Sequence, residues 1–129
     1  MLLNNNMEEN TESIKDTILK FGSRAVEDYS KENVQTLTGE RANNYLSLLA
    51  GFSALLEERQ GELEILEATF MITNRANYKS NADTELYWKG SEDGKEQIRI
   101  SHLIKGVDKV CRACRDRLRQ LQQEAFNQQ

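Results

Sequence analysis

The chain has 129 residues, 29% of them charged, and a net charge of −4, which is the size of about one domain. Its mean hydropathy is −0.71, and no apolar stretch approaches the ~18 residues that a membrane span requires. The sequence contains no proline, and since proline inside a helix costs about 3 kcal/mol, its absence favours long uninterrupted helices.

The first ten residues are rich in asparagine and show no apolar period. We expect a flexible N-terminus over 1–10, followed by a single helical domain over 11–129. No basic region precedes an apolar one, as it would in a signal or transit peptide, and two cysteines do not make a disulfide framework. The expected location is the cytoplasm.

From about Thr11 to Asn33 the spacing predicts an amphipathic helix, and Gln35–Gly39 is the expected connection, with Thr38 capping the next helix. The apolar side chains of this first helix recur every three or four residues: Ile14, Ile18, Phe21, Ala25 and Tyr29.

The longest predicted helix runs from Glu40 to about Asn77, and its apolar residues alternate at spacings of three and four, as in a coiled coil. Arg59 interrupts the seam, and Gly51 and Gly61 lie inside the helix, where each costs up to about 1 kcal/mol unless another backbone comes close. The seam consists of Tyr45, Leu49, Phe52, Leu56, Leu63, Leu66 and Phe70.

A break over Lys79–Gly94 contains a short helical piece and a turn at Gly90–Gly94. The last helix is predicted from about Lys95 to Glu124. Its apolar stripe is Ile100, Leu103, Val107, Val110, Cys114, Leu118 and Leu121. The fold class that follows is all-α: a long antiparallel, coiled-coil-like helical hairpin with a shorter N-terminal helix packed alongside.

No residue pattern favours an enzyme, a cofactor or a metal site. Cys111 and Cys114 lie within a helix rather than at the start of one, where a redox pair is activated, and a structural zinc ion needs four ligands. We interpret the two cysteines as small apolar side chains on a packed face; a metal ion that bridges subunits is the alternative. His102 has no partner for general-base catalysis. The acidic residues near Glu57–Glu67 are interpreted as a solvated face.

The positive charge is concentrated in the last helix. Residues 95–119 carry eight Lys or Arg side chains against three acidic ones, whereas residues 1–94 carry nine against seventeen. One face of this helix carries the row Lys105, Lys109, Arg112 and Arg119, with Arg115 beside it. Such a row can follow a phosphate backbone, or it can neutralise the acidic face of Glu40–Glu67 by helix packing. Both interpretations stay open.

Aromatic and basic residues alternate near the break between the long helices. Single-stranded nucleic acids stack on exposed aromatic rings among cations, although the same rings could instead plug the end of the helical pair. The candidate nucleic-acid-binding residues therefore also include Arg75, Lys79, Trp88 and Lys89. Tyr78 and Tyr87 are the other aromatic residues that alternate with these cations.

The arrangement resembles phage recombination mediators of the UvsY type over roughly Glu62–Gln122. The similar stretches are Glu62–Ala68, Arg75–Lys79 and Ile104–Val107, which leads into the arginine-rich end. The resemblance implies a cytoplasmic homo-oligomer, in a bacterium or a phage-infected host, that binds single-stranded DNA and works with a recombinase or a single-strand-binding protein. The contacts that it implies are made by Lys79, Lys105, Lys109, Arg112 and Arg115.

A second class of function is a helical interaction or assembly protein without direct DNA binding. It would be a virion or scaffolding component, or a small subunit or inhibitor of a nucleic-acid effector complex. Reversal of the charges of Lys105, Lys109 and Arg112 separates the two classes, because only DNA binding requires them.

Overall fold

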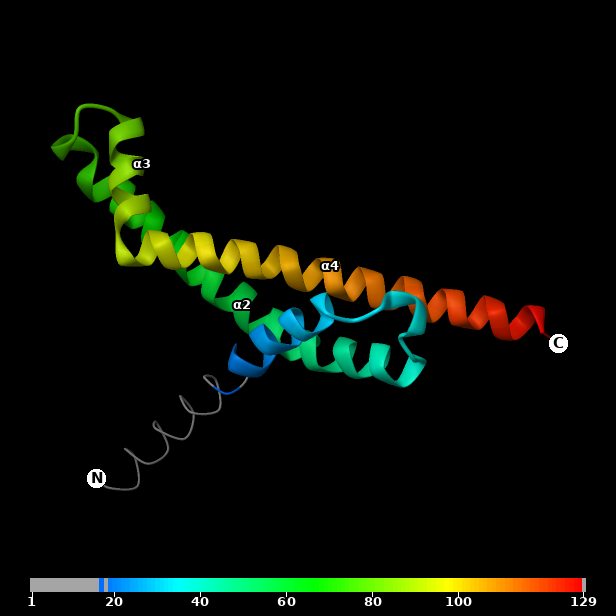
Figure 1. The fold of residues 1–129 in the computed structure, drawn as a ribbon. Helices are drawn as coiled ribbons and strands as arrows, with labels where there is room; N and C mark the ends of the chain where they lie inside the picture. The colour runs from blue at the N-terminus through cyan, green and yellow to red at the C-terminus, as the bar shows by residue number, and fades with distance from the viewer. Residues whose placement is uncertain (1–16, 18, 129) are drawn as a thin grey trace, which may run out of the picture. The chain divides into compact units, whose positions relative to one another are not determined.

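The computed structural model describes residue 17 and residues 19–128, and every regular element in this part of the chain is helical (Figure 1). The N-terminal helix is described over residues 19–30. After it come the 3-10 helix η1 (Val34–Thr36), α2 (Gly39–Asn74), the 3-10 helix η2 (Arg75–Asn77), α3 (Asn81–Gly90) and α4 (Glu92–Asn127). The predicted all-α fold, with two long helices and a shorter N-terminal helix, is confirmed for the described residues.

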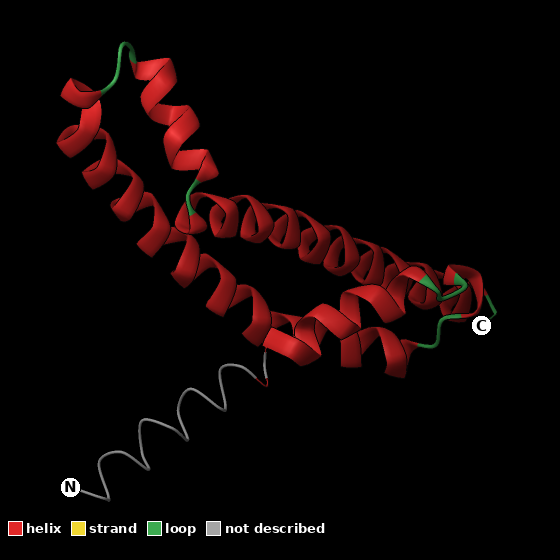
Figure 2. Cartoon of the chain, turned by 60° about the vertical axis from the view of Figure 1, so that its left-hand side comes forward, coloured by secondary structure: helices red, strands yellow, loops and turns green. Residues whose placement is uncertain are grey.

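The chain forms two compact units, Met1–Leu55 with Gly106–Gln129, and Leu56–Lys105. Each unit contains a stretch of α2 and a stretch of α4 that run antiparallel (Figure 2). In the first unit Gly39 of α2 lies beside Leu118 of α4, and in the second Gln60 Nε2 donates to Ser101 Oγ at 2.9 Å. The single domain over 11–129 stays a prediction, and the predicted flexible segment 1–10 lies outside the described residues.

In the first unit the N-terminal helix packs against α2 and α4. A Cβ placed on Gly22 would stand 2.1 Å from Cγ of Phe52 in α2, and one placed on Gly106 of α4 would stand 3.5 Å from Cγ1 of Val26. Only a glycine at position 22 lets the two helices come this close. The buried apolar side chains of this unit are Ala25, Leu37, Ala42, Leu49, Phe52, Val107, Val110 and Cys114.

The connection between the N-terminal helix and α2 is held by side-chain bonds at both of its ends. The hydroxyl of Thr38 accepts from the backbone N–H of Arg41 at 3.2 Å, which confirms the predicted cap. Arg117 of α4 is buried and donates to two carbonyls of the connection, to Leu37 at 2.9 Å and to Gln35 at 2.8 Å. The loop is thus tied to α4.

In the second unit the two long helices are joined by polar bonds around an apolar centre of Leu56, Leu63 and Ile100. Gln97 donates to Glu67 at 2.8 Å. α3 is capped at its N-terminus by Ser80, whose hydroxyl accepts from the N–H of Asp83 at 3.2 Å.

The predicted stripes are largely correct where the structure describes them. On the N-terminal helix, Ala25 is buried and Tyr29 half-buried, but Phe21 is 49% exposed; Ile14 and Ile18 lie outside the described residues. The α2 seam is buried at Leu49, Phe52, Leu56 and Leu63, half-buried at Tyr45 and Phe70, and exposed at Leu66. The α4 stripe is buried at Ile100, Val107, Val110 and Cys114, and half-buried at Leu103, Leu118 and Leu121.

The predicted turn over Gly90–Gly94 is wrong in extent. Only Ser91 separates α3 from α4, and Gly94 lies inside the first turn of α4. A Cβ on Gly94 would stand 1.8 Å from the carbonyl oxygen of Trp88, so this glycine permits a close approach of two helices rather than a loop. Gly51 and Gly61 have no such neighbour, because nothing lies within 4 Å of a Cβ built on either.

No helix in the described part of the chain is both long and apolar enough to cross a membrane.

Candidate nucleic-acid interface

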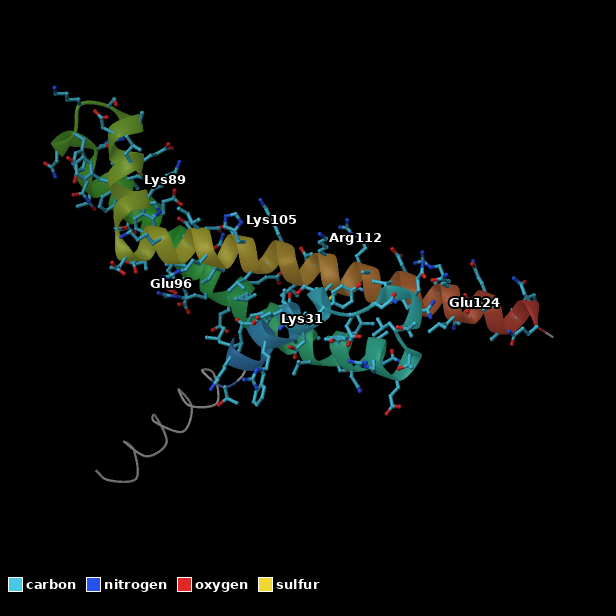
Figure 3. All side chains as sticks on the ribbon, in the orientation of Figure 1. Lys31, Lys89, Glu96, Lys105, Arg112 and Glu124 are labelled. Atoms are coloured by element: carbon cyan, nitrogen blue, oxygen red, sulfur yellow. The ribbon has the colours of Figure 1, made fainter. Side chains whose placement is uncertain are left out.

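The five candidate binding residues of the last helix all lie on α4 and are all exposed: Lys105, Lys109, Arg112, Arg115 and Arg119. Lys109, Arg112, Arg115 and Arg119 belong to the first unit, and Lys105 is the last residue of the second. The side chains of Lys105 and Arg112 point out of the α4 ribbon, away from the stretch of α2 in their own unit (Figure 3). The apolar stripe and the basic row therefore occupy different faces of α4.

The basic row does not pair with acidic residues of α2 in the part of the chain that the structure describes. Its one ion pair is local, between Arg119 and Asp116 at 3.6 Å, with side chains 70% and 63% exposed. The ion pair between the long helices has the opposite sense, because basic Arg59 lies on α2 and acidic Glu96 on α4, 2.7 Å apart. The positive charges of Lys109 and Arg112 are left facing solvent.

The hydrogen bond to Arg59 is the main cause of a lowered pKa at Glu96, assisted by the positive charges of Arg59 and Arg99 and opposed by partial burial. Arg59 has a raised pKa, caused first by its bond to Glu96 and next by that to Glu62. Arg59, the charged residue in the α2 seam, is thus paired with two carboxylates of the second unit, Glu62 and Glu96.

A second group of predicted residues lies in the second unit. Arg75 on η2, Lys79 after it and Lys89 at the end of α3 are all exposed, and Figure 3 shows Lys89 at the edge of α3. Beside them the rings of Tyr78 and Tyr87 stack, with centroids 4.2 Å apart and an angle of 21° between their planes. Tyr87 is 60% exposed, so one face of this pair is open to a flat ligand.

Trp88 does not have the exposed ring that stacking on a nucleobase requires. The residue is 4% exposed, its Nε1 donates to Gln97 Oε1 at 2.7 Å, and its ring lies 5.6 Å from that of Phe70. The satisfied N–H and the aromatic contact are typical of a core tryptophan. The candidate stacking ring is therefore Tyr87 rather than Trp88.

The residue spacing in α3 is compatible with Trp88, rather than Tyr87, facing the core. Thr84 and Trp88 are four residues apart, which places them on one helical face, and both are buried. Tyr87 lies about 100° around the helix from Trp88. Because the adjacent Tyr87 and Trp88 are both large and aromatic, their composition alone does not say which one faces the core.

The two cysteines lie on the packed side of α4. Cys114 is buried and Cys111 half-buried, and burial is the main cause of a raised pKa in both thiols. A raised pKa lowers the thiolate fraction, which is the reverse of what thiol–disulfide chemistry needs. His102 is exposed. The described residues contain no group of three or more His, Cys, Asp or Glu placed to hold a metal ion.

Comparison with protein-family models, with curated protein sequences and with solved structures finds no match for this chain.

Proposed function

We propose that this protein is a non-catalytic nucleic-acid-binding protein that holds single-stranded DNA on the basic face of α4. The observation that carries the proposal is the exposed row Lys105, Lys109 and Arg112, which forms no ion pair within the described residues and is separate from the apolar stripe. An unpaired row of cations costs stability by self-repulsion, and a polyanion offsets that cost.

The geometry suits a phosphate backbone. Within the first unit, from Lys109 to Arg119, the helix rises about 15 Å at 1.5 Å per residue, so this part of the row meets several successive phosphates of an extended strand. Each cation that neutralises a phosphate releases bound counterions, which gives salt-sensitive affinity. The exposed face of the Tyr78–Tyr87 pair, with Lys79 and Lys89, offers a stacking surface in the second unit, and stacking favours single strands over duplexes.

The resemblance to recombination mediators of the UvsY type supports a more specific proposal. Such a protein acts as an oligomer, and its partners are single-stranded DNA and a recombinase or a single-strand-binding protein. Lys79, Lys105, Lys109, Arg112 and Arg115, the residues that this resemblance implies for DNA contact, are all exposed.

The test is fluorescence anisotropy with a labelled single strand and the triple variant K105E/K109E/R112E. The matched control is K20E/R24E/K31E, which reverses two exposed charges of the N-terminal helix and that of exposed Lys31 directly after it, and changes the net charge equally. We expect the α4 variant to weaken binding at least about 100-fold, since three lost phosphate contacts cost that much at moderate salt. The control variant should change binding much less. Equal losses in both variants would show a general charge effect and contradict the assignment to α4.

A second candidate function is a helical assembly protein without DNA binding. It is favoured by large apolar side chains that the second unit leaves exposed, among them Ile65 at 70% and Ile72 at 71%. Wild-type protein that self-associates or captures a helical partner, but does not bind single strands even at low salt, would favour this function over DNA binding.

A further inference from the structure

The side of α2 that faces away from α4 carries a second heptad pattern in the second unit. Glu58, Gly61, Ile65, Ala68, Ile72 and Arg75 follow one another at spacings of three, four, three, four and three; the first five lie on α2, and Arg75 directly follows it as the first residue of η2. The first seam of α2, through Leu56 and Leu63, is buried in the same unit. On a helix with 3.6 residues per turn, residue 65 lies about 160° from residue 63. The second pattern is therefore on the opposite face.

This second face is apolar and uncovered. Ile65 is 70% exposed and Ile72 is 71% exposed, Ala68 is exposed, and nothing lies within 4 Å of a Cβ built on Gly61. Single exposed apolar residues are common, but two isoleucines that are two turns apart on one stripe mark a contact surface.

The order of the residues is self-complementary when the face meets a copy of itself in antiparallel orientation. In this register, two residues face each other when their numbers add up to 133. Gly61 is then opposite Ile72, so a large side chain enters the space above a glycine. Ile65 is then opposite Ala68, which again matches a large side chain with a small one. At each end of the contact Glu58 faces Arg75 with the opposite charge. Close-packed helices require such large-to-small matching.

A parallel pair of the same faces would lack these matches. It would place Glu58 beside Glu58 and Arg75 beside Arg75, which is repulsive at both ends, and would leave a gap where the two Gly61 residues met. Both arrangements obey two-fold symmetry, in which one patch serves both partners, so it is the contacts that favour the antiparallel register. Glu58 and Arg75 are exposed, and within the described part of the chain no ion pair occupies either one.

We infer that this protein self-associates through α2, with residues 58–75 of two copies packed antiparallel around a two-fold axis between positions 66 and 67. The contact is about 25 Å long at 1.5 Å per residue. It assigns Arg75 to the contact between copies and removes it from the candidate nucleic-acid residues. Self-association through α2 does not require DNA binding, so either proposal can be wrong while the other holds.

The first experiment measures the mass of the purified chain by sedimentation velocity, without DNA, up to about 100 μM, which covers dissociation constants into the micromolar range. I65D/I72D should weaken self-association at least about 100-fold, because two apolar side chains per copy leave the contact. The matched control is L86D, which adds a charge at another exposed apolar residue of the same unit (66% exposed) and should leave the mass unchanged. A monomeric wild-type chain, or equal loss in both variants, would overturn the inference.

The second experiment tests the register. In E58R alone, the introduced arginine meets Arg75 of the other copy, and in R75E alone the introduced glutamate meets Glu58. Each variant should therefore associate about tenfold more weakly. An equimolar mixture of E58R and R75E opposes unlike charges at both ends, so it should form a mixed dimer with restored affinity. The double variant E58R/R75E should be restored as well. Self-association that these charges leave unchanged, or a mixture that behaves as the average of its parts, would contradict the antiparallel register.

Discussion

Single residues in the apolar stripes have roles that their chemistry alone does not reveal. Arg117 follows Val110 and Cys114 at the stripe spacing of three and four, and like them it is buried. Its guanidinium donates to the carbonyls of Gln35 and Leu37 and to Gln120 at 3.1 Å. A planar group with five N–H donors suits such a set of acceptors. Arg117 thereby replaces an apolar contact with a clamp on the loop before α2.

Replacement of Arg117 by methionine should destabilise the protein by about 1.5–3 kcal/mol, the usual range for hydrogen bonds to a charged donor. The carbonyls of Gln35 and Leu37 would lose these donors, while the apolar stem would be kept. The free energy of unfolding from urea titration measures the effect. Arg115→Met, two residues away and exposed, is the control and should change stability little. An equal effect at both positions would show that the clamp does not stabilise the fold.

At the scale of elements, the packing of the N-terminal helix on α2 depends on the absence of a side chain at Gly22. Gly22→Ala should cost about 1–3 kcal/mol, because the new methyl group overlaps the Phe52 ring and the helices must separate. Gly51→Ala, in open space on α2, should instead stabilise by up to about 1 kcal/mol through helix propensity. Thermal unfolding followed by circular dichroism should give shifts of opposite sign. Stabilisation by Gly22→Ala would contradict the close approach.

The two long helices of the second unit are also joined by a titratable pair, Arg59 and Glu96. Because Arg59 lowers the pKa of Glu96 below its ordinary value of 4.5, the carboxylate stabilises the fold above that pH, and the contribution is lost as the pH falls through the lowered value. The side chains are 38% and 32% exposed, so solvent screening limits the effect to below about 1 kcal/mol.

Urea unfolding of wild type and Glu96→Gln between pH 7 and pH 3 should show the wild type more stable at pH 7 and the difference shrinking in acid. A difference that stayed constant with pH would mean that the charge of Glu96 does not matter.

At the scale of the whole molecule, the spacing of apolar residues was sufficient to predict the helices. It did not predict correctly at every position which side of a helix is buried. The heptad alternation correctly predicted burial of Leu49, Phe52, Leu56 and Leu63. It failed at Leu66, which is 41% exposed; an α-helix drifts by about 20° per heptad, which turns some seam positions away from a partner helix.

Two further differences depend on contacts between different helices. Gly94 looked like part of a turn because glycine is common in turns, but it is needed where α4 passes the Trp88 carbonyl. Trp88 looked like a candidate stacking ring, and only the position of Gln97 and Phe70 places it in the core. Helical spacing placed the basic residues of α4 on one face, but the spacing alone left open whether that face packs against acidic residues or faces solvent.

The most direct test of the proposed function is the salt dependence of wild-type binding to a labelled single strand, followed by anisotropy, with a duplex of the same length beside it. Stacking on the Tyr78–Tyr87 pair predicts tighter binding to the single strand than to the duplex, and the basic row of α4 predicts three to five phosphate contacts. These contacts predict that log K falls with log salt concentration at a slope of about −2 to −3.5. No binding at low salt, or an affinity that does not change with salt, would contradict the account of α4 as a phosphate-binding face.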